Sequence, residues 1–152
     1  MSKISRHLEV IFCDDIRSEV GNKSSYMGIY TRELTIPSAP LLLAKLCIAV
    51  QVVTDIDDPF ESIMVQVVKI RGQEETELLT TGQITLPPPS VLSDVDNDST
   101  RLLLGLQFVL SPFQIDEESI LRVKATTERE ELHGAGLRLR IVPPPAPLTI
   151  QN

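Results

Sequence analysis

The chain has 152 residues, a formal charge of −7, and only 4% aromatic residues with no Trp. A chain of this length forms one domain with a sizeable core that needs no metal or disulfide. The 14 Lys and Arg residues are scattered among 21 acids. Scarce aromatic and scattered basic residues argue against base-stacking and phosphate-binding surfaces, so we expect no nucleic-acid partner.

The positions of the cysteines and the lengths of the apolar runs indicate the cellular compartment of the protein. Cys13 and Cys47 both lie inside apolar runs, which favours free, buried thiols in a reducing cytosol. The first seven residues lack the apolar segment of a signal peptide. The longest apolar runs are interrupted by Lys45, Gln51 or Asp55 and are too short to span a bilayer. We therefore expect a cytoplasmic protein without membrane contact.

Alternating and β-branched runs predict eight to nine short strands and no helix longer than two turns. In chain order the runs are residues 7–13, 24–30, 33–36, 44–54, 62–71, 76–81, 101–110, 119–126 and 137–141. The run 62–71 is apolar on both faces, which predicts a central strand. The pattern predicts an all-β fold, a single-domain antiparallel β-sandwich of Ig-like or C2-like shape.

Proline-rich segments mark the ends of this pattern. Residues 87–89 are three consecutive prolines, which have no amide hydrogen for a sheet ladder, so a long connection or edge segment is expected there. Four of residues 143–147 are also prolines. We therefore assign residues 1–142 to the β-sandwich domain and 143–152 to an extended Pro-rich tail.

Two adjacent acids and a nearby arginine follow the first apolar run: Asp14, Asp15 and Arg17. Adjacent strand residues point to opposite faces, so these two carboxylates are unsuited to a shared metal or acid/base role. We interpret the three residues as a structural motif at a bend. One acid would accept hydrogen bonds from backbone amides, and Arg17 would pair with it.

Two acidic loops raise the alternative of a weak cation site. An EF-hand needs Gly at loop position six and Glu at position twelve, but a loop beginning at Asp94 has Ser99 and Gly105 there. The loops could instead combine as a C2-type site if they meet at one end of the sandwich. The candidate ligands are Asp57, Asp58, Asp94, Asp96 and Asp98. A solvated acidic surface is the competing interpretation.

The sequence contains no recognisable catalytic arrangement. His7 and His133 are the only histidines and lack the close spacing of zinc ligands. A Cys13–His133 dyad is an alternative, but a thiol in an apolar strand is typical of an inert core residue. We expect no cofactor.

The opening sequence Phe-Cys-Asp-Asp-Ile-Arg at 12–17, followed by Lys-Ser-Ser-Tyr-Met-Gly-Ile-Tyr at 23–30, resembles an uncharacterised bacterial and phage-associated domain family of unknown function. Segments 46–50, 57–60 and 112–123 extend the resemblance over most of residues 8–142. Ser119 departs from it, because such proteins tend to have Gly there. The resemblance implies a common β-sandwich and phage or mobile-element neighbourhoods. It implies no activity and no functional residues.

These observations favour a non-enzymatic β-sandwich that acts through protein–protein or self-association surfaces, because long aliphatic strands leave an edge or face that needs a cover. The alternative is a C2-like ligand- or cation-binding module that uses the acidic end loops. An enzyme is the third and weakest hypothesis.

Overall fold

A computed structural model describes residues 3–88 and 99–149, and all thirteen elements in these ranges are β-strands. The strands are β1 (His7–Glu19), β2 (Lys23–Tyr30), β3 (Glu33–Ile36), β4 (Leu41–Leu43), β5 (Leu46–Asp55), β6 (Ser62–Arg71), β7 (Glu74–Thr80), β8 (Ile84–Thr85), β9 (Arg101–Leu110), β10 (Phe113–Ile115), β11 (Ser119–Thr127), β12 (Glu131–His133) and β13 (Leu137–Ile141). The all-β prediction is therefore confirmed.

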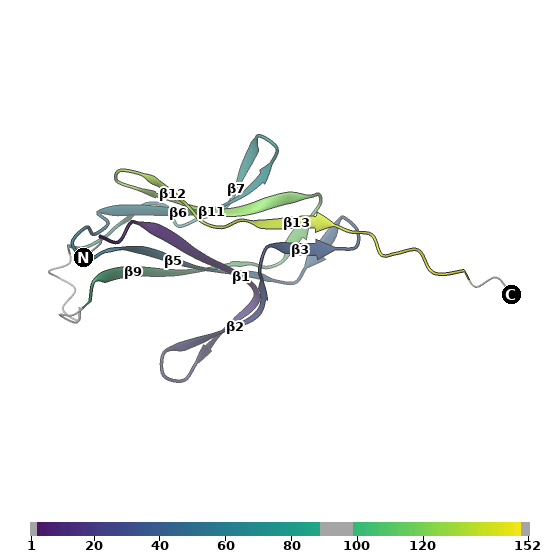
Figure 1. The fold of residues 1–152 in the computed structure, drawn as a ribbon, viewed down its shortest axis with the longest axis horizontal. Helices are drawn as coiled ribbons and strands as arrows, with labels where there is room; N and C mark the ends of the chain where they lie inside the picture. The colour runs from purple at the N-terminus through teal and green to yellow at the C-terminus, as the bar shows by residue number, and fades with distance from the viewer. Residues whose placement is uncertain (1–2, 89–98, 150–152) are drawn as a thin grey trace.

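The strands form three sheets (Figure 1). Sheet 1 has the order β2-β1-β5-β9. Sheet 2 has the order β3-β13-β11-β6-β7, with β12 paired to β11 and β8 to β6. The third sheet contains only β10 and β4. Every pairing is antiparallel except that of β13 with β3.

Sheets 1 and 2 share one hydrophobic core built from aliphatic side chains. Sheet 1 contributes Phe12, Leu46, Ile48, Val50 and Val52. Sheet 2 contributes Leu34, Ile36, Ile63, Val65, Val67, Leu121, Val123, Ala125, Leu132, Leu137 and Leu139. Strand β6 lies between β11 and β7, which confirms the central position predicted for residues 62–71.

The prediction of eight to nine strands is too low. The nine predicted runs all correspond to strands, and the additional four are β4, β8, β10 and β12. These four contain only two or three residues each. Such segments are too short to display a period-2 pattern, and only their partner strands define them.

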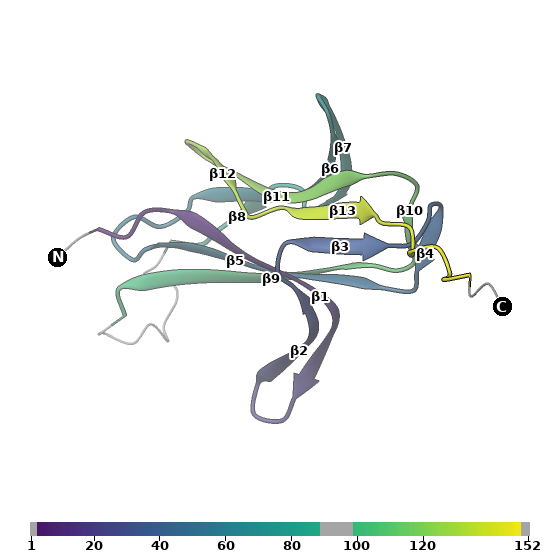
Figure 2. The same cartoon turned by 45° about the vertical axis from the view of Figure 1, so that its right-hand side comes forward.

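Strand β1 changes partner along its length. Residues 7–13 pair with β5, whereas residues 12–19 pair with β2. The β1–β2 hairpin consequently projects away from the shared core (Figure 2). A second hairpin, β6–β7, projects on the opposite side.

After β13, residues 143–149 are exposed and have no regular structure, and they lead away from the sheets (Figure 1).

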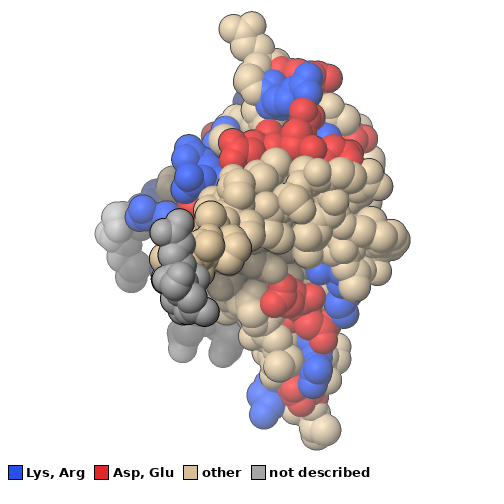
Figure 3. Space-filling model, turned by 90° about the vertical axis from the view of Figure 1, so that its right-hand side faces the viewer, with Lys and Arg blue, Asp and Glu red and all other residues tan. Residues whose placement is uncertain are grey.

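Acidic and basic side chains gather above and below an uncharged middle region in Figure 3, on the sides of the two projecting hairpins. Within the described ranges, no helix is long and apolar enough to cross a membrane.

Candidate functional site

The Asp14, Asp15 and Arg17 motif lies within β1 and not at a bend. The turn of the hairpin is formed by residues 20–22, where Gly21 has φ of 85° and Asn22 has φ of 56°. The expected bend at the motif is therefore wrong. Because the motif continues the strand, its carboxylates bond to side chains instead of accepting from backbone amides at a turn.

Asp15 is the centre of an exposed charge cluster. Arg17 donates from Nε to Asp15 Oδ2 at 3.2 Å, so the expected ion pair is present. Lys45 donates to the other carboxylate oxygen. The hydrogen bonds from Lys45 and Arg17, in that order, lower the pKa of Asp15. The Arg17 side chain is 62% exposed, so water screens this cluster strongly.

Asp14 has a different partner on the other side of β1. The Tyr30 hydroxyl donates to its carboxylate. Burial, followed by this hydrogen bond, raises the pKa of Tyr30 to about 12. Gly28 has φ of +65°, and a Cβ there would lie 2.1 Å from Asp14 Oδ2. A glycine is therefore required beneath Asp14, which makes this acid part of the hairpin's architecture.

A second charge cluster, which sequence reasoning missed, surrounds Arg6. Its side chain is only 2% exposed and lies 2.6 Å from Glu128 and 3.6 Å from Asp58. Arg6 Nη2 donates to the Pro59 carbonyl at 2.8 Å, and the guanidinium lies 4.7 Å from the ring centre of Phe60. The partners of Arg6 lie more than fifty residues away along the chain, and Glu128 more than a hundred, so no local pattern around Arg6 indicates these contacts.

The carboxylates around Arg6 are held in the charged form. Burial would raise the pKa of Glu128, but the hydrogen bond from Arg6 and those from the Glu61 and Ser62 amides outweigh it and leave the pKa lowered. The Asp58 pKa is also lowered, principally by the hydrogen bond from Arg129. The cluster therefore joins the segment before β1 to the β5–β6 and β11–β12 loops.

The candidate cation ligands are only partly described. Asp94, Asp96 and Asp98 lie outside the described residues. Asp58 is 16% exposed and pairs with Arg129, whereas Asp57 is exposed. Among residues 3–88 and 99–149, no three His, Cys, Asp or Glu side chains are grouped as a metal site would require.

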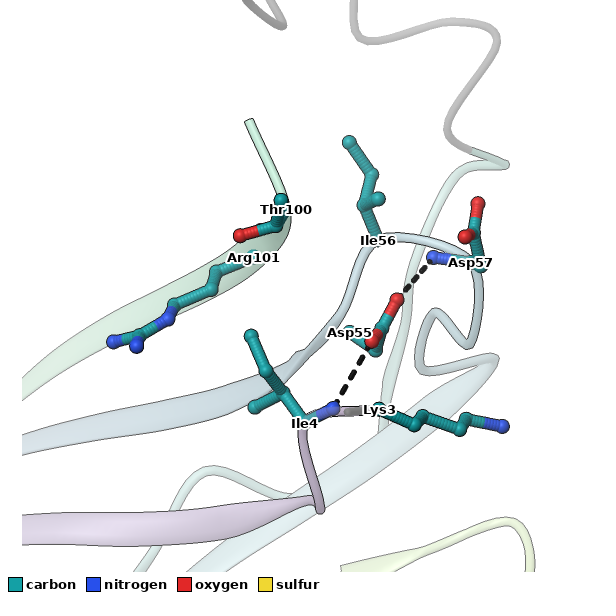
Figure 4. A pocket seen from close by; sticks show the side chains of 7 residues that line it. All are labelled: Lys3, Ile4, Asp55, Ile56, Asp57, Thr100 and Arg101. Atoms are coloured by element: carbon teal, nitrogen blue, oxygen red, sulfur yellow. Dashed lines mark hydrogen bonds between the residues drawn. The ribbon is translucent and has the colours of Figure 1, made fainter. Parts of the chain in front are cut away.

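An open depression of about 640 Å³ lies beside these loops (Figure 4). Its lining residues are Lys3, Ile4, Asp55, Ile56, Asp57, Thr100 and Arg101. Asp55 accepts hydrogen bonds from the amides of Asp57 at 3.0 Å and Ile4 at 3.1 Å, which lower its pKa. This acid therefore organises the loop. The remaining polar groups can contact a polar ligand, but they do not form a nucleophile–base pair.

The hypothetical Cys13–His133 dyad is not assembled. Cys13 is buried in β1 of sheet 1, whereas His133 is exposed in β12 and lies 3.0 Å from Glu131. His7 is bonded to the Ser5 carbonyl at 2.8 Å. Neither histidine faces a thiol.

Among the described strands, sheet 1 has two edge strands, β2 and β9, and β9 is the longer of the two. Within the described residues, β9 pairs only with β5, in an uninterrupted register from residue 101 to 110. Its outward side chains Leu103 and Val109 are 60% and 52% exposed. Its inward side chains are only partly buried against the core. A small apolar cavity of about 190 Å³ adjoins its first half, lined by Pro59, Phe60, Leu86, Pro87, Leu102, Leu103 and Leu104.

Neither a protein-family model nor a curated protein matches this chain.

Proposed function

We propose that this protein is a non-enzymatic β-sandwich, Ig-like or C2-like, that binds a second copy of itself through the edge of β9. The open β9 edge carries this proposal. The proposal includes a cytoplasmic location and membership of the bacterial and phage-associated family that the opening motif resembles. It includes no cofactor, nucleic acid or membrane.

The composition of β9 supports pairing with another strand. Exposed sheet edges usually carry charges, prolines or bulges that prevent association. Strand β9 has a charge only at Arg101, contains no proline, and shows no register shift against β5. An edge of this length with an uninterrupted register and almost no charge is a template for a further strand.

A second copy of β9 is the partner that fits this edge. In a two-fold dimer centred on Leu106, residues 102–110 of both chains would pair antiparallel. Leu103 would then lie opposite the partner's Val109, and Leu104 opposite the partner's Phe108. Centring the axis on Gly105 would instead place Arg101 opposite the partner's Val109. The first register pairs apolar side chains at every position except where Gly105 lies opposite the partner's Gln107, which favours it.

The area of this interface predicts a weak dimer. One pair of edge strands buries less than the roughly 1,600 Å² of a standard interface. The net charge of −7 also opposes association. We therefore expect a dissociation constant on the order of micromolar and a dimer population that rises with ionic strength.

Multi-angle light scattering over a concentration series tests this proposal. Leu103→Lys should abolish the dimer, because it places a charge on the pairing edge of each copy. Leu42→Lys is the matched control, since Leu42 is 62% exposed but belongs to β4. A wild-type protein that stays monomeric at all concentrations contradicts the proposal, as does an equal effect of both substitutions.

The second candidate is the C2-like cation module, and one contact favours it. Ile56 N donates to Thr100 O at 3.1 Å, so the acidic β5–β6 loop lies beside the residues that directly follow Asp98 (Figure 4). Calcium titration by calorimetry tests it. Saturable heat that is lost in both Asp57→Asn and Asp96→Asn supports this candidate. Absence of saturable heat in the wild type contradicts it.

A further inference from the structure

The two cysteines occupy directly opposite positions on neighbouring strands of sheet 1. Cys13 in β1 pairs with Cys47 in β5. Opposite residues of antiparallel strands point to the same face with Cα atoms about 4.5–5.5 Å apart. Disulfides span Cα separations of about 4.4–6.8 Å. The backbone therefore already holds the two residues at a spacing that a disulfide requires.

Both thiols lie on the face of sheet 1 that points away from the core. Their strand neighbours Phe12, Leu46 and Ile48 belong to the core, so Cys13 and Cys47 point the other way. Each thiol has only a weak hydrogen bond, from Cys13 to the Asp15 carbonyl at 3.5 Å and from Cys47 to the Asp14 carbonyl at 3.8 Å. Neither bond prevents the sulfur atoms from facing each other.

The projecting β1–β2 hairpin begins at this cysteine pair. Phe12 and Cys13 are the two residues of β1 that pair with both β5 and β2. Beyond Cys13, β1 pairs only with β2 among the described strands. A covalent bond between Cys13 and Cys47 would fasten the base of the hairpin to β5, the neighbouring inner strand of sheet 1.

The thiols are flanked by two apolar side chains, which we take as their cover. Ile29 of β2 lies opposite Cys13, and Val109 of β9 lies opposite Cys47, so the four residues form one row across sheet 1. Ile29 and Val109 are themselves half exposed, whereas Cys13 and Cys47 are 0% and 2% exposed. Burial, followed by the nearby Cys47, raises the pKa of Cys13. The closed sheet therefore slows oxidation of the pair.

Strand β2 is the part of this cover that opens most easily. Among the described strands it pairs only with β1, and most of its side chains are exposed. Segments with few buried contacts open locally before the rest of a domain. When β2 separates, Cys13 loses Ile29 and becomes accessible from that side.

We propose that Cys13 and Cys47 form a reversible intrachain disulfide that locks the β1–β2 hairpin to β5 when a small disulfide oxidant is present. The Cys13 thiolate attacks glutathione disulfide, forming a mixed disulfide and releasing one glutathione thiolate. The Cys47 thiolate then attacks Cys13 Sγ, which forms the protein disulfide and expels the second glutathione. Two protein thiols are thereby oxidised, one glutathione disulfide is reduced to two thiols, and both protein protons pass to solvent or to the released thiolates.

The protein disulfide has a long lifetime once β2 re-forms over it. Re-formed β2 shields the sulfur atoms from bulk thiols, so reduction again requires local opening. The bond closes a loop that contains the projecting part of β1 together with β2, β3 and β4. We expect oxidation to raise the melting temperature by about 5–10 °C.

Peptide mapping of the intact chain in a glutathione redox series provides the direct test. Trypsin places Cys13 in peptide 7–17 and Cys47 in peptide 46–69. Oxidised wild type should contain these two peptides linked, and a reductant should separate them. Hydrogen exchange of the β2 amides should slow on oxidation in wild type but not in Cys47→Ala. Glutathione adducts or interchain links without the 7–17/46–69 pair overturn the proposal, as does unchanged β2 exchange in the oxidised protein.

A matched pair of variants tests the role of β2 as the cover. Ile29→Ala should speed disulfide formation several-fold, because it removes the side chain beside Cys13. Met27→Ala is the control, since Met27 lies on the same strand face but opposite Asp15. Equal oxidation rates in the two variants overturn the opening mechanism.

Discussion

One cluster of charged side chains lies just before β1 and another within its projecting half, and the two differ in how far water reaches them. Arg6, before the strand, is 2% exposed and contacts two carboxylates, a carbonyl and an aromatic ring. Arg17, in the projecting half of the strand, is 62% exposed and contacts Asp15. The chemistry is the same in both, but desolvation makes the first interaction strong and screening makes the second weak. Burial therefore decides which cluster stabilises the fold.

Arg6→Ala should have the largest effect. The substitution leaves Glu128 and Asp58 without their shared cation and removes packing against Phe60. We expect a loss of about 2–4 kcal/mol in the free energy of unfolding, as for broken buried ion pairs. Urea denaturation measures this loss, and Arg6→Lys should recover only part of it because Lys lacks the planar fork. A loss below about 0.5 kcal/mol would show that the buried Arg6 cluster stabilises the fold no more than the exposed Arg17 cluster does.

Gly28→Ala should have the next largest effect, within the hairpin itself. The new Cβ would clash with Asp14 and would also occupy a left-handed backbone conformation, so we expect a loss of about 2 kcal/mol. Gly21→Ala is the control. Its φ is also positive, but its nearest contact for a Cβ is a flexible lysine carbon at 3.8 Å. Equal losses in thermal denaturation would show that Asp14 places no constraint on position 28.

The pH dependence of stability should distinguish the clusters next. The lowered pKa of Glu128 means that its contribution is present above its usual value of 4.5 and is lost as the pH falls through the folded value. Stability should therefore decrease below about pH 4.5. The slope should be shallower in Arg6→Ala, because Glu128 then loses the hydrogen bond that lowers its pKa. Urea midpoints at several pH values measure both slopes, and identical slopes would contradict this assignment.

Arg17→Ala should have the smallest effect. The motif interpretation alone would predict a loss of about 1–3 kcal/mol if Arg17 were partly buried. Its exposure reduces the expectation to below about 0.5 kcal/mol. The melting temperature measures this loss directly. A loss above about 1 kcal/mol would show that the Arg17–Asp15 ion pair stabilises the fold more than the exposure of Arg17 suggests.

The accuracy of the sequence predictions followed the length of each element. The alternation in 119–126 and 137–141 predicted β11 and β13, because long strands repeat their pattern several times. Strand β12 has only three residues and was missed. The predicted bend at Asp14 was wrong because charged residues tolerate an exposed strand as well as a turn, and only pairing with β2 distinguishes the two.

For the candidate sites, too, the sequence revealed local patterns but not the contacts between distant residues. The acid–arginine motif was visible as a sequence pattern, and so was the apolar setting of Cys13 and Cys47. That the two cysteines lie opposite each other depends on the register between β1 and β5. That Arg6 contacts Glu128 depends on bringing the start of the chain to the β11–β12 loop. Neither relation leaves a local signal.

The sequence by itself determined the all-β class, the aliphatic core and most of the strands, because these properties follow from side-chain periodicity and composition within each segment. Only the tertiary structure decided which strand became an open edge, which charges were desolvated and which thiols met. These properties depend on contacts between residues far apart in the chain, and the local sequence pattern does not specify such contacts.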